Sequence, residues 1–239
     1  MTAGVAAGML KDDSLYKEGK MSQTKQFECP ECQTPGQHTM EKRISITKHP
    51  HLKDDILSGS YFEWVCPGCA RRFFVDDVFL YNDDAHKFMV YLVPGYDEDT
   101  LPIPTLIKTD EDYDTQNSIL RVTAGFVDFA EKIRILEAGL DDRVIEAVKA
   151  IYASVHRDTW IEDVYNIIFE GIGDGGELNF DVFLEKDDFS FGVPREIYEK
   201  TLQDFSFLRE QKEGEAFLLI DQNWLNSKLG GPSENTDAE

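Results

Sequence analysis

The sequence predicts an α+β protein, in which an N-terminal zinc-ribbon-like antiparallel β domain precedes a mixed α+β domain with a helical hairpin and a β-hairpin. Two Cys-Pro-x-Cys pairs in the first third of the chain stand between runs with the apolar alternation of strands. Farther along, apolar residues recur at helical steps of three and four, and two alternating runs then flank a glycine-rich turn.

Shifts in composition divide the chain into five predicted segments. These are a leader at 1–24 that we expect to be disordered, the zinc-ribbon domain at 25–94, an acidic linker at 95–117, an acidic α+β domain at 118–229, and a disordered polar tail at 230–239. The leader contains little pattern and is followed by Phe27, which opens the first convincing strand, so we leave open whether residues 1–20 are native.

The first domain is expected to be a meander of antiparallel strands. Alternation of apolar and polar residues predicts these strands at 26–28, 38–48, 61–65, 73–81 and 87–93. Between the second and third strands, residues 50–57 have the pattern of a short helical turn, which Gly59 ends.

The second domain should begin with a strand at 119–122 and a helical hairpin. Apolar residues over 126–140 share one helical face, Gly139 ends that helix, and Asp141 is a good N-cap for the next one. The later elements are strands at 164–170 and 178–185, a helix that begins at Pro194, a strand at 217–220 and a last helix capped by Asp221.

All four cysteines of the chain, Cys29, Cys32, Cys66 and Cys69, lie in the two Cys-Pro-x-Cys pairs. Each pair places two sulfurs on a tight turn, whose backbone N–H groups can hydrogen-bond the thiolates and whose proline fixes one backbone dihedral. Two such turns supply the four tetrahedral ligands of one zinc ion. Because four thiolates leave no position open for water, we expect this zinc to be structural and not catalytic.

A pair of redox-active dithiols is the competing interpretation. A thioredoxin-type motif normally lies at a helix N-terminus within a βαβ pattern, whereas strand-like runs flank both pairs here. Two close pairs in the first third of a 239-residue chain also make a poor disulfide framework. We therefore expect a reducing compartment and a cytoplasmic protein.

The chain is strongly acidic, with a formal net charge of −22. The imbalance lies mainly after residue 98, where 31 acidic side chains accompany 13 basic ones. Because phosphate backbones attract basic surfaces, this disfavours nucleic acids and anionic membranes as partners, while a basic protein or peptide would be attracted. A surface that only keeps the protein in solution is the simpler alternative.

No apolar run is long enough to span a bilayer, and residues 1–20 lack the apolar core of a signal peptide.

The histidines are expected to have no role in the metal site. His49 and His51 flank a proline in a predicted loop, and a zinc ion with four thiolates needs no imidazole. His86 lies in a predicted turn and His156 follows a helix end, and neither has a recognisable nucleophile nearby in the sequence.

Two further motifs are interpreted as turns. Residues 171–176 satisfy G-x-G-x-x-G, but a dinucleotide site needs a helix next, and the alternation from residue 177 onward predicts a strand. The run Asp141-Asp142-Arg143 fits a turn between two helices, with a recognition surface as the alternative.

The two Cys-Pro-x-Cys pairs, the run YFEWVCP at 61–67 and the run FMVYLVP at 88–94 resemble the CpXC domain proteins. Residues 137–146 resemble the helix-turn-helix segment that often follows that domain, and the resemblance is loose beyond residue 94. It implies a bacterial or archaeal protein with a presumed zinc-binding domain, the four cysteines as ligands and no catalytic residue. Gln33 and Ala70 depart from the glycine that is common after such turns.

Three functions follow as hypotheses. The first is a zinc-binding accessory protein whose acidic α+β domain binds another protein. The second is an enzyme, hydrolase-like, with a carboxylate-lined pocket in the C-terminal domain, although no catalytic motif is present in the sequence. The third is a regulator that binds nucleic acid through Lys42, Arg43, Arg71 and Arg72 of the ribbon.

Overall fold

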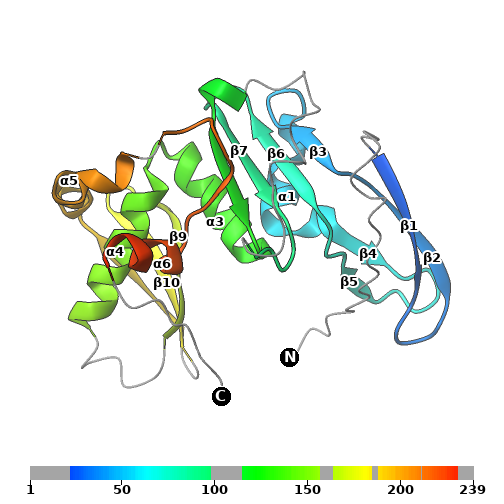
Figure 1. Cartoon of the computed structure of the whole chain (residues 1–239). Helices are drawn as coiled ribbons and strands as arrows, with labels where there is room; N and C mark the ends of the chain where they lie inside the picture. Colours follow the sequence, from blue (N-terminus) through cyan, green and yellow to red (C-terminus); the bar gives the residue numbers. More distant parts are fainter. Residues whose placement is uncertain (1–21, 98–114, 157–163, 185–187, 211, 231–239) are drawn as a thin grey trace, which may run out of the picture.

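The computed structural model describes residues 22–97, 115–156, 164–184, 188–210 and 212–230. It confirms the predicted α+β class: several sheets, with antiparallel hairpins near the N-terminus, are combined with helices (Figure 1). The predicted leader and tail lie almost wholly outside the described residues, and so does most of the predicted linker. Among the described residues, no helix combines the length and the apolar character that a bilayer crossing requires.

A five-stranded sheet forms the centre of the molecule. Its order is β12 (Leu218–Leu219), β8 (Ile119–Thr123), β7 (Phe88–Leu92), β6 (Phe79–Asp83) and β3 (Arg43–Ser45). β6 and β7 are antiparallel, as a tight hairpin requires, and the other neighbours are parallel. The predicted linker at 95–117 falls between β7 and β8, which are adjacent strands in this sheet.

The parallel pairing of β3 with β6 departs from the predicted antiparallel meander. Parallel neighbours need a long crossover, and here the chain between them forms helices η2 (Pro50–Leu52), α1 (Lys53–Ser58) and η3 (Ser60–Phe62) and strands β4 (Glu63–Val65) and β5 (Arg72–Phe74). The predicted helical turn is therefore part of this crossover. It ends as expected at Gly59, whose φ of 84° is left-handed.

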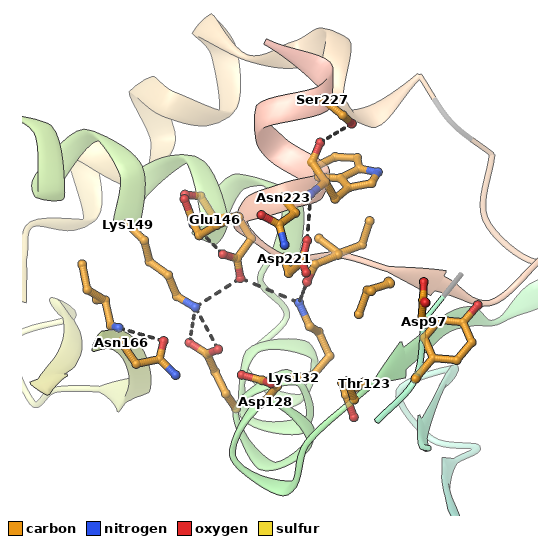
Figure 2. A pocket seen from close by; sticks show the side chains of 18 of the residues that line it. Asp97, Thr123, Asp128, Lys132, Glu146, Lys149, Asn166, Asp221, Asn223 and Ser227 are labelled. Atoms are coloured by element: carbon orange, nitrogen blue, oxygen red, sulfur yellow. Dashed lines mark hydrogen bonds and ion pairs between the residues drawn. The ribbon is translucent and has the colours of Figure 1, made fainter. Parts of the chain in front are cut away.

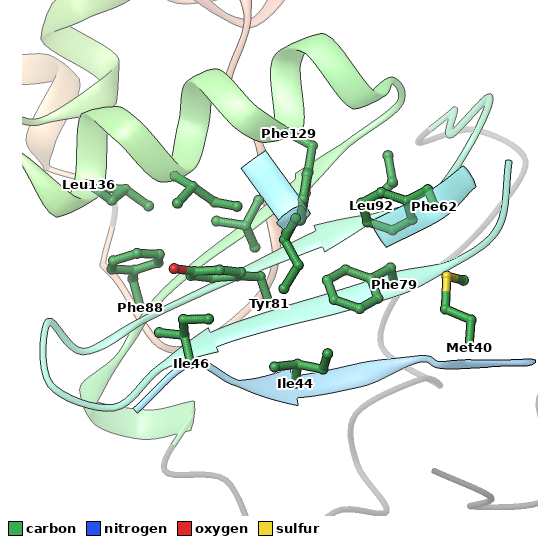
Figure 3. Close-up of a cluster of buried hydrophobic side chains, with 13 residues drawn as sticks. Met40, Ile44, Ile46, Phe62, Phe79, Tyr81, Phe88, Leu92, Phe129 and Leu136 are labelled. Carbon is green, nitrogen blue, oxygen red and sulfur yellow. The ribbon is translucent and has the colours of Figure 1, made fainter. Parts of the chain in front are cut away.

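Helices α1 and α3 (Phe126–Glu137) cover one face of the central sheet (Figure 3). Aromatic side chains dominate this core, with Phe62 in contact with Phe79 at 5.1 Å and with Phe129 at 6.4 Å between ring centroids. Its buried members come from both sides of residue 94: Met40, Ile44, Ile46, Ile56, Phe62, Phe79, Tyr81, Phe88, Val90, Leu92, Phe129, Ile133 and Leu136.

A second, antiparallel sheet packs on the other side of α3. It has the order β11 (Phe189–Val193), β10 (Leu178–Leu184), β9 (Val164–Ile172), and α4 (Asp142–Val155) and α5 (Arg195–Asp204) complete its core. The predicted helical hairpin and β-hairpin are confirmed; of the predicted turn at 171–176, residues 171–172 end β9 and residues 173–177 form the turn to β10. β11 was not predicted.

Two small hairpins lie at one end of the central sheet (Figure 1). β1 (Ser22–Glu28) pairs with β2 (Pro35–Glu41), and β4 (Glu63–Val65) pairs with β5 (Arg72–Phe74). The predicted strand at 38–48 is thus divided between β2 and β3, with Lys42 between them. The remaining elements are η4 (Thr115–Asn117), η5 (Ser206–Arg209) and α6 (Gln222–Lys228), whose predicted N-cap Asp221 accepts a hydrogen bond from the Trp224 N–H.

Candidate metal centre

The two cysteine pairs occupy the turns of the two small hairpins, and the backbone of the two turns follows the same pattern. The N–H of the first cysteine donates to the carbonyl five residues later, and the N–H four residues later donates back to the cysteine carbonyl. The distances are 3.0 Å for Cys29 N–Thr34 O, 2.8 Å for Gln33 N–Cys29 O, 2.8 Å for Cys66 N–Arg71 O and 2.9 Å for Ala70 N–Cys66 O. The repeated sequence pattern therefore folds into two equivalent turns.

The four sulfurs converge between these turns. All four Sγ atoms lie within 4.8 Å of one another, and the Cys29–Cys69 and Cys32–Cys66 sulfurs are each 3.6 Å apart. A tetrahedron with metal–sulfur bonds of about 2.3 Å has edges of about 3.8 Å, whereas a disulfide is about 2.05 Å long. The four thiols are free and are placed to hold one metal ion.

The residue after each pair has a left-handed backbone. The φ angles are 59° at Gln33 and 58° at Ala70. A residue with a Cβ pays about 1–2 kcal/mol for this conformation, which glycine adopts without strain. These are the positions at which the chain departs from the glycine common after such turns, and the turn nevertheless keeps its shape at both.

A small aromatic cluster supports the sulfurs. The Trp64 ring stacks between Phe27 and Phe73, with 5.7 Å between centroids on each side, and it packs with the buried ligands Cys29 and Cys66. A Cβ added at Gly36 would overlap the Trp64 ring, so β2 approaches the indole closely. The two hairpins are thus joined by the sulfurs and by this cluster.

The thiols differ in acidity. Hydrogen bonds with the Thr34 side chain and backbone lower the pKa of Cys32 to about 6. At Cys69 the backbone of Arg71 also lowers the pKa, but desolvation and the three neighbouring thiols outweigh it and raise the pKa to about 12. Close packing against the other thiols thus opposes the ionisation of Cys69, and a bound cation would remove that opposition.

A model of the CpXC protein family matches residues 27–149, which include all four cysteines and run through β8 and α3 into α4. The chain belongs to the CpXC family. No curated protein and no solved structure matches this CpXC chain. The family match therefore confirms the resemblance seen in the cysteine motifs and adds no activity to it.

The histidines of this CpXC protein lie apart from the sulfurs. Among the described residues, the four cysteines are the only group of three or more His, Cys, Asp or Glu side chains that is placed to hold a metal ion. The His49 and His51 rings are 6.1 Å apart and exposed, His86 pairs with Asp83 at 2.7 Å, and His156 is the C-cap of α4.

Sequence analysis missed a second cluster of functional groups, the buried charges between α3, α4 and β8. Seven charged side chains there are less than one-tenth exposed: Arg121, Glu131, Lys132, Asp142, Arg143, Glu146 and Lys149. Asp141 is the N-cap of α4, as predicted. The recognition-surface alternative for Asp142 and Arg143 is wrong, because both side chains are buried in ion pairs.

Beside this cluster lies a cavity of about 940 Å³ (Figure 2). Three adjacent parallel strands, β7, β8 and β12, point their carboxyl ends at it, and α3, α4 and α6 supply its other walls. In open α/β sheets, such crevices at strand ends are where ligands bind.

Proposed function

We propose that this CpXC protein binds one zinc ion through Cys29, Cys32, Cys66 and Cys69, and that the ion is structural. The observation that carries the proposal is the convergence of four free sulfurs to within 4.8 Å. A tetrahedral four-sulfur donor set suits zinc and leaves no open position for a substrate or water.

The role of the ion is to join two hairpins that have little core of their own. An isolated two-stranded hairpin is marginally stable in water, and the cluster beneath the sulfurs buries only Cys29, Trp64, Cys66 and Val75. Metal binding then contributes directly to the folding of this part of the chain.

Metal analysis of the purified full chain tests this proposal. We expect about one zinc per chain, a cobalt derivative with the absorption of tetrahedral thiolate coordination, and loss of the metal in Cys66→Ser. Glu31→Gln is the matched control, because Glu31 lies within the first turn and supplies no sulfur. A zinc content near zero in wild-type protein refolded with zinc would overturn the proposal.

We further propose that the protein acts as an accessory module whose acidic region binds a basic protein or peptide. The excess of 31 acidic over 13 basic side chains after residue 98 supports this role. Salt screens the attraction between the acidic surface and a basic partner, with a Debye length of about 8–10 Å near physiological ionic strength. A lysine-rich peptide should therefore bind with an affinity that falls steeply between about 50 and 200 mM salt. Equal binding of a glutamate-rich peptide would contradict the proposal.

An enzyme with a carboxylate-lined pocket is the second candidate, favoured by the cavity and its buried Glu131 and Glu146. Both carboxylates accept hydrogen bonds from Lys149, so neither is free to act as a base without rearrangement. The nucleic-acid hypothesis has less support, because Lys42, Arg71 and Arg72 each form an ion pair with an acidic side chain.

A further inference from the structure

The cavity at the ends of β7, β8 and β12 has the size of a small-molecule site. Its volume of about 940 Å³ is at the upper end of the range of about 300–1,000 Å³ in which ligand pockets fall. Leu219, Ile220 and Trp224 give it apolar walls, and Thr123 and Asp128 are among its polar lining residues.

The two cations in its wall are turned toward protein groups (Figure 2). Lys132 Nζ donates to the Ile220 carbonyl at 2.8 Å and pairs with Asp142 at 3.1 Å. Lys149 Nζ lies 2.6 Å from Glu131 and 3.1 Å from Glu146. Among the described residues that line the cavity, an anionic ligand would therefore find no uncommitted positive charge.

Unlike these two lysines, Asp128 is a charged side chain without a partner among the described residues. It lies in the first turn of α3, its side chain is exposed at the cavity, and its carboxylate has no hydrogen bond or ion pair with any other described residue. Desolvation by the surrounding walls raises the pKa of Asp128, although Lys149 and Lys132 lower it in part. The carboxylate is thus held at a position where a cation would stabilise it.

Thr123 supplies an independent sign of a ligand. Its side chain is 1% exposed and lines the cavity, and its hydroxyl has no hydrogen-bond partner within the described part of the chain. A buried hydroxyl without a partner costs about 1–3 kcal/mol, so such a group is uncommon unless something else can satisfy it.

We infer that this cavity binds a small aliphatic amine, with its ammonium group held by Asp128 and its hydrocarbon chain against Ile220 and Trp224. An ammonium has donors only, which suits a carboxylate with no partner. Asp221 adds a second negative charge to the cavity lining while its Oδ1 caps α6. The inference does not depend on the zinc centre, which lies at the other end of the sheet.

Calorimetric titration of the zinc-loaded full chain with cadaverine, and with glutarate as the anionic compound of equal carbon number, tests this site. We expect cadaverine to bind and glutarate not to bind. Asp128→Asn should weaken cadaverine binding by about tenfold or more, the loss expected for a hydrogen bond between charged groups. Thr123→Val should weaken it by a smaller factor.

Asp174→Asn is the matched control, because it removes the same charge from an exposed turn beyond the far end of β9. If Asp128→Asn and Asp174→Asn weakened cadaverine binding equally, the effect would come from general surface charge and the proposed site would be overturned. No detectable binding of cadaverine to the wild-type protein would also overturn it. A lysine side chain of a partner could bring the same ammonium group. If a lysine-containing peptide bound in an Asp128-dependent manner and cadaverine did not, the free amine would be rejected as the ligand.

Discussion

The guanidinium of Arg121 donates two hydrogen bonds to the carboxylate of Asp142, from Nε at 2.7 Å and from Nη2 at 2.9 Å. Both side chains are 1% exposed, and the same guanidinium donates two more bonds, each of 2.8 Å, to Glu213. This contact fixes β8 to the first residue of α4 and to a segment more than 90 residues farther along the chain. The central sheet and the second sheet are therefore joined by a bidentate ion pair as well as by α3.

Replacement of Asp142 by Asn should destabilise the protein by about 3–5 kcal/mol, because it removes the buried carboxylate that Arg121 and Lys132 share and leaves Arg121 only Glu213 as a charged partner. Urea unfolding followed by circular dichroism measures this change. Glu199→Gln is the control, since Glu199 is exposed and 3.8 Å from Arg195, and it should change stability by less than about 0.5 kcal/mol. Equal effects of the two variants would mean that the buried pair adds nothing specific.

The contribution of Asp142 should also depend on pH. Burial alone would raise the pKa of Asp142, but the charges of Arg121 and Lys132 outweigh it and hold this pKa below its usual range. A group with a lowered pKa contributes its full stability above its unfolded pKa of about 3.9 and loses it as the pH falls toward the folded value. The difference in unfolding free energy between wild type and Asp142→Asn should be constant from pH 5 to 8 and shrink below about pH 4. A difference that grew in acid would contradict the assignment.

Removal of the metal should loosen the two small hairpins and leave the central sheet folded. The clusters are separate: the one beneath the sulfurs contains Trp64 and Val75, whereas the main core lies between α3 and the sheet. Hydrogen exchange after treatment with a chelator should show lost protection over 27–36 and 63–74 and retained protection over 79–92. Uniform loss across all three segments would show instead that the whole chain unfolds with the metal site.

Ala70→Gly should stabilise the metal-bound protein by up to about 1 kcal/mol, because the φ of 58° at this position favours glycine. Chemical denaturation of the zinc-loaded protein measures the gain. Ala85→Gly, at an exposed turn residue without a positive φ, should give a small loss through the greater entropy of the unfolded chain. A loss of stability in Ala70→Gly as large as that in Ala85→Gly would rule out relief of strain.

Local features of this fold could be predicted from the sequence because each depends on a few neighbouring residues. Gly59 ends α1, Asp141 and Asp221 cap α4 and α6, and the glycine-rich run that begins at Gly171 contains the hairpin turn between β9 and β10. The cysteine spacing likewise predicted that the four sulfurs lie together, since two tight turns on paired strands can approach each other closely.

Strand order could not be predicted in the same way. β3 lies beside β6, and β7 lies beside β8, because long crossovers bring distant segments together, and no local pattern encodes which partner a strand selects. The buried charges were missed for a related reason. Glu131 and Lys132 lie among apolar residues of α3 and have the polarity of a solvated face, but α3 lies between two sheets, so both side chains are buried.

The indole of Trp64 has a practical consequence. It stacks within the cluster that contains Cys29 and Cys66, while Trp224 lines the cavity on the far side of the sheet. The chain therefore carries a native fluorophore beside each of its two candidate sites. In a Trp160→Phe background, which removes the third tryptophan of the chain, the emission of Trp224→Phe should report events at the sulfurs and that of Trp64→Phe should report events in the cavity, so that occupancy of the two sites can be followed separately without an attached dye.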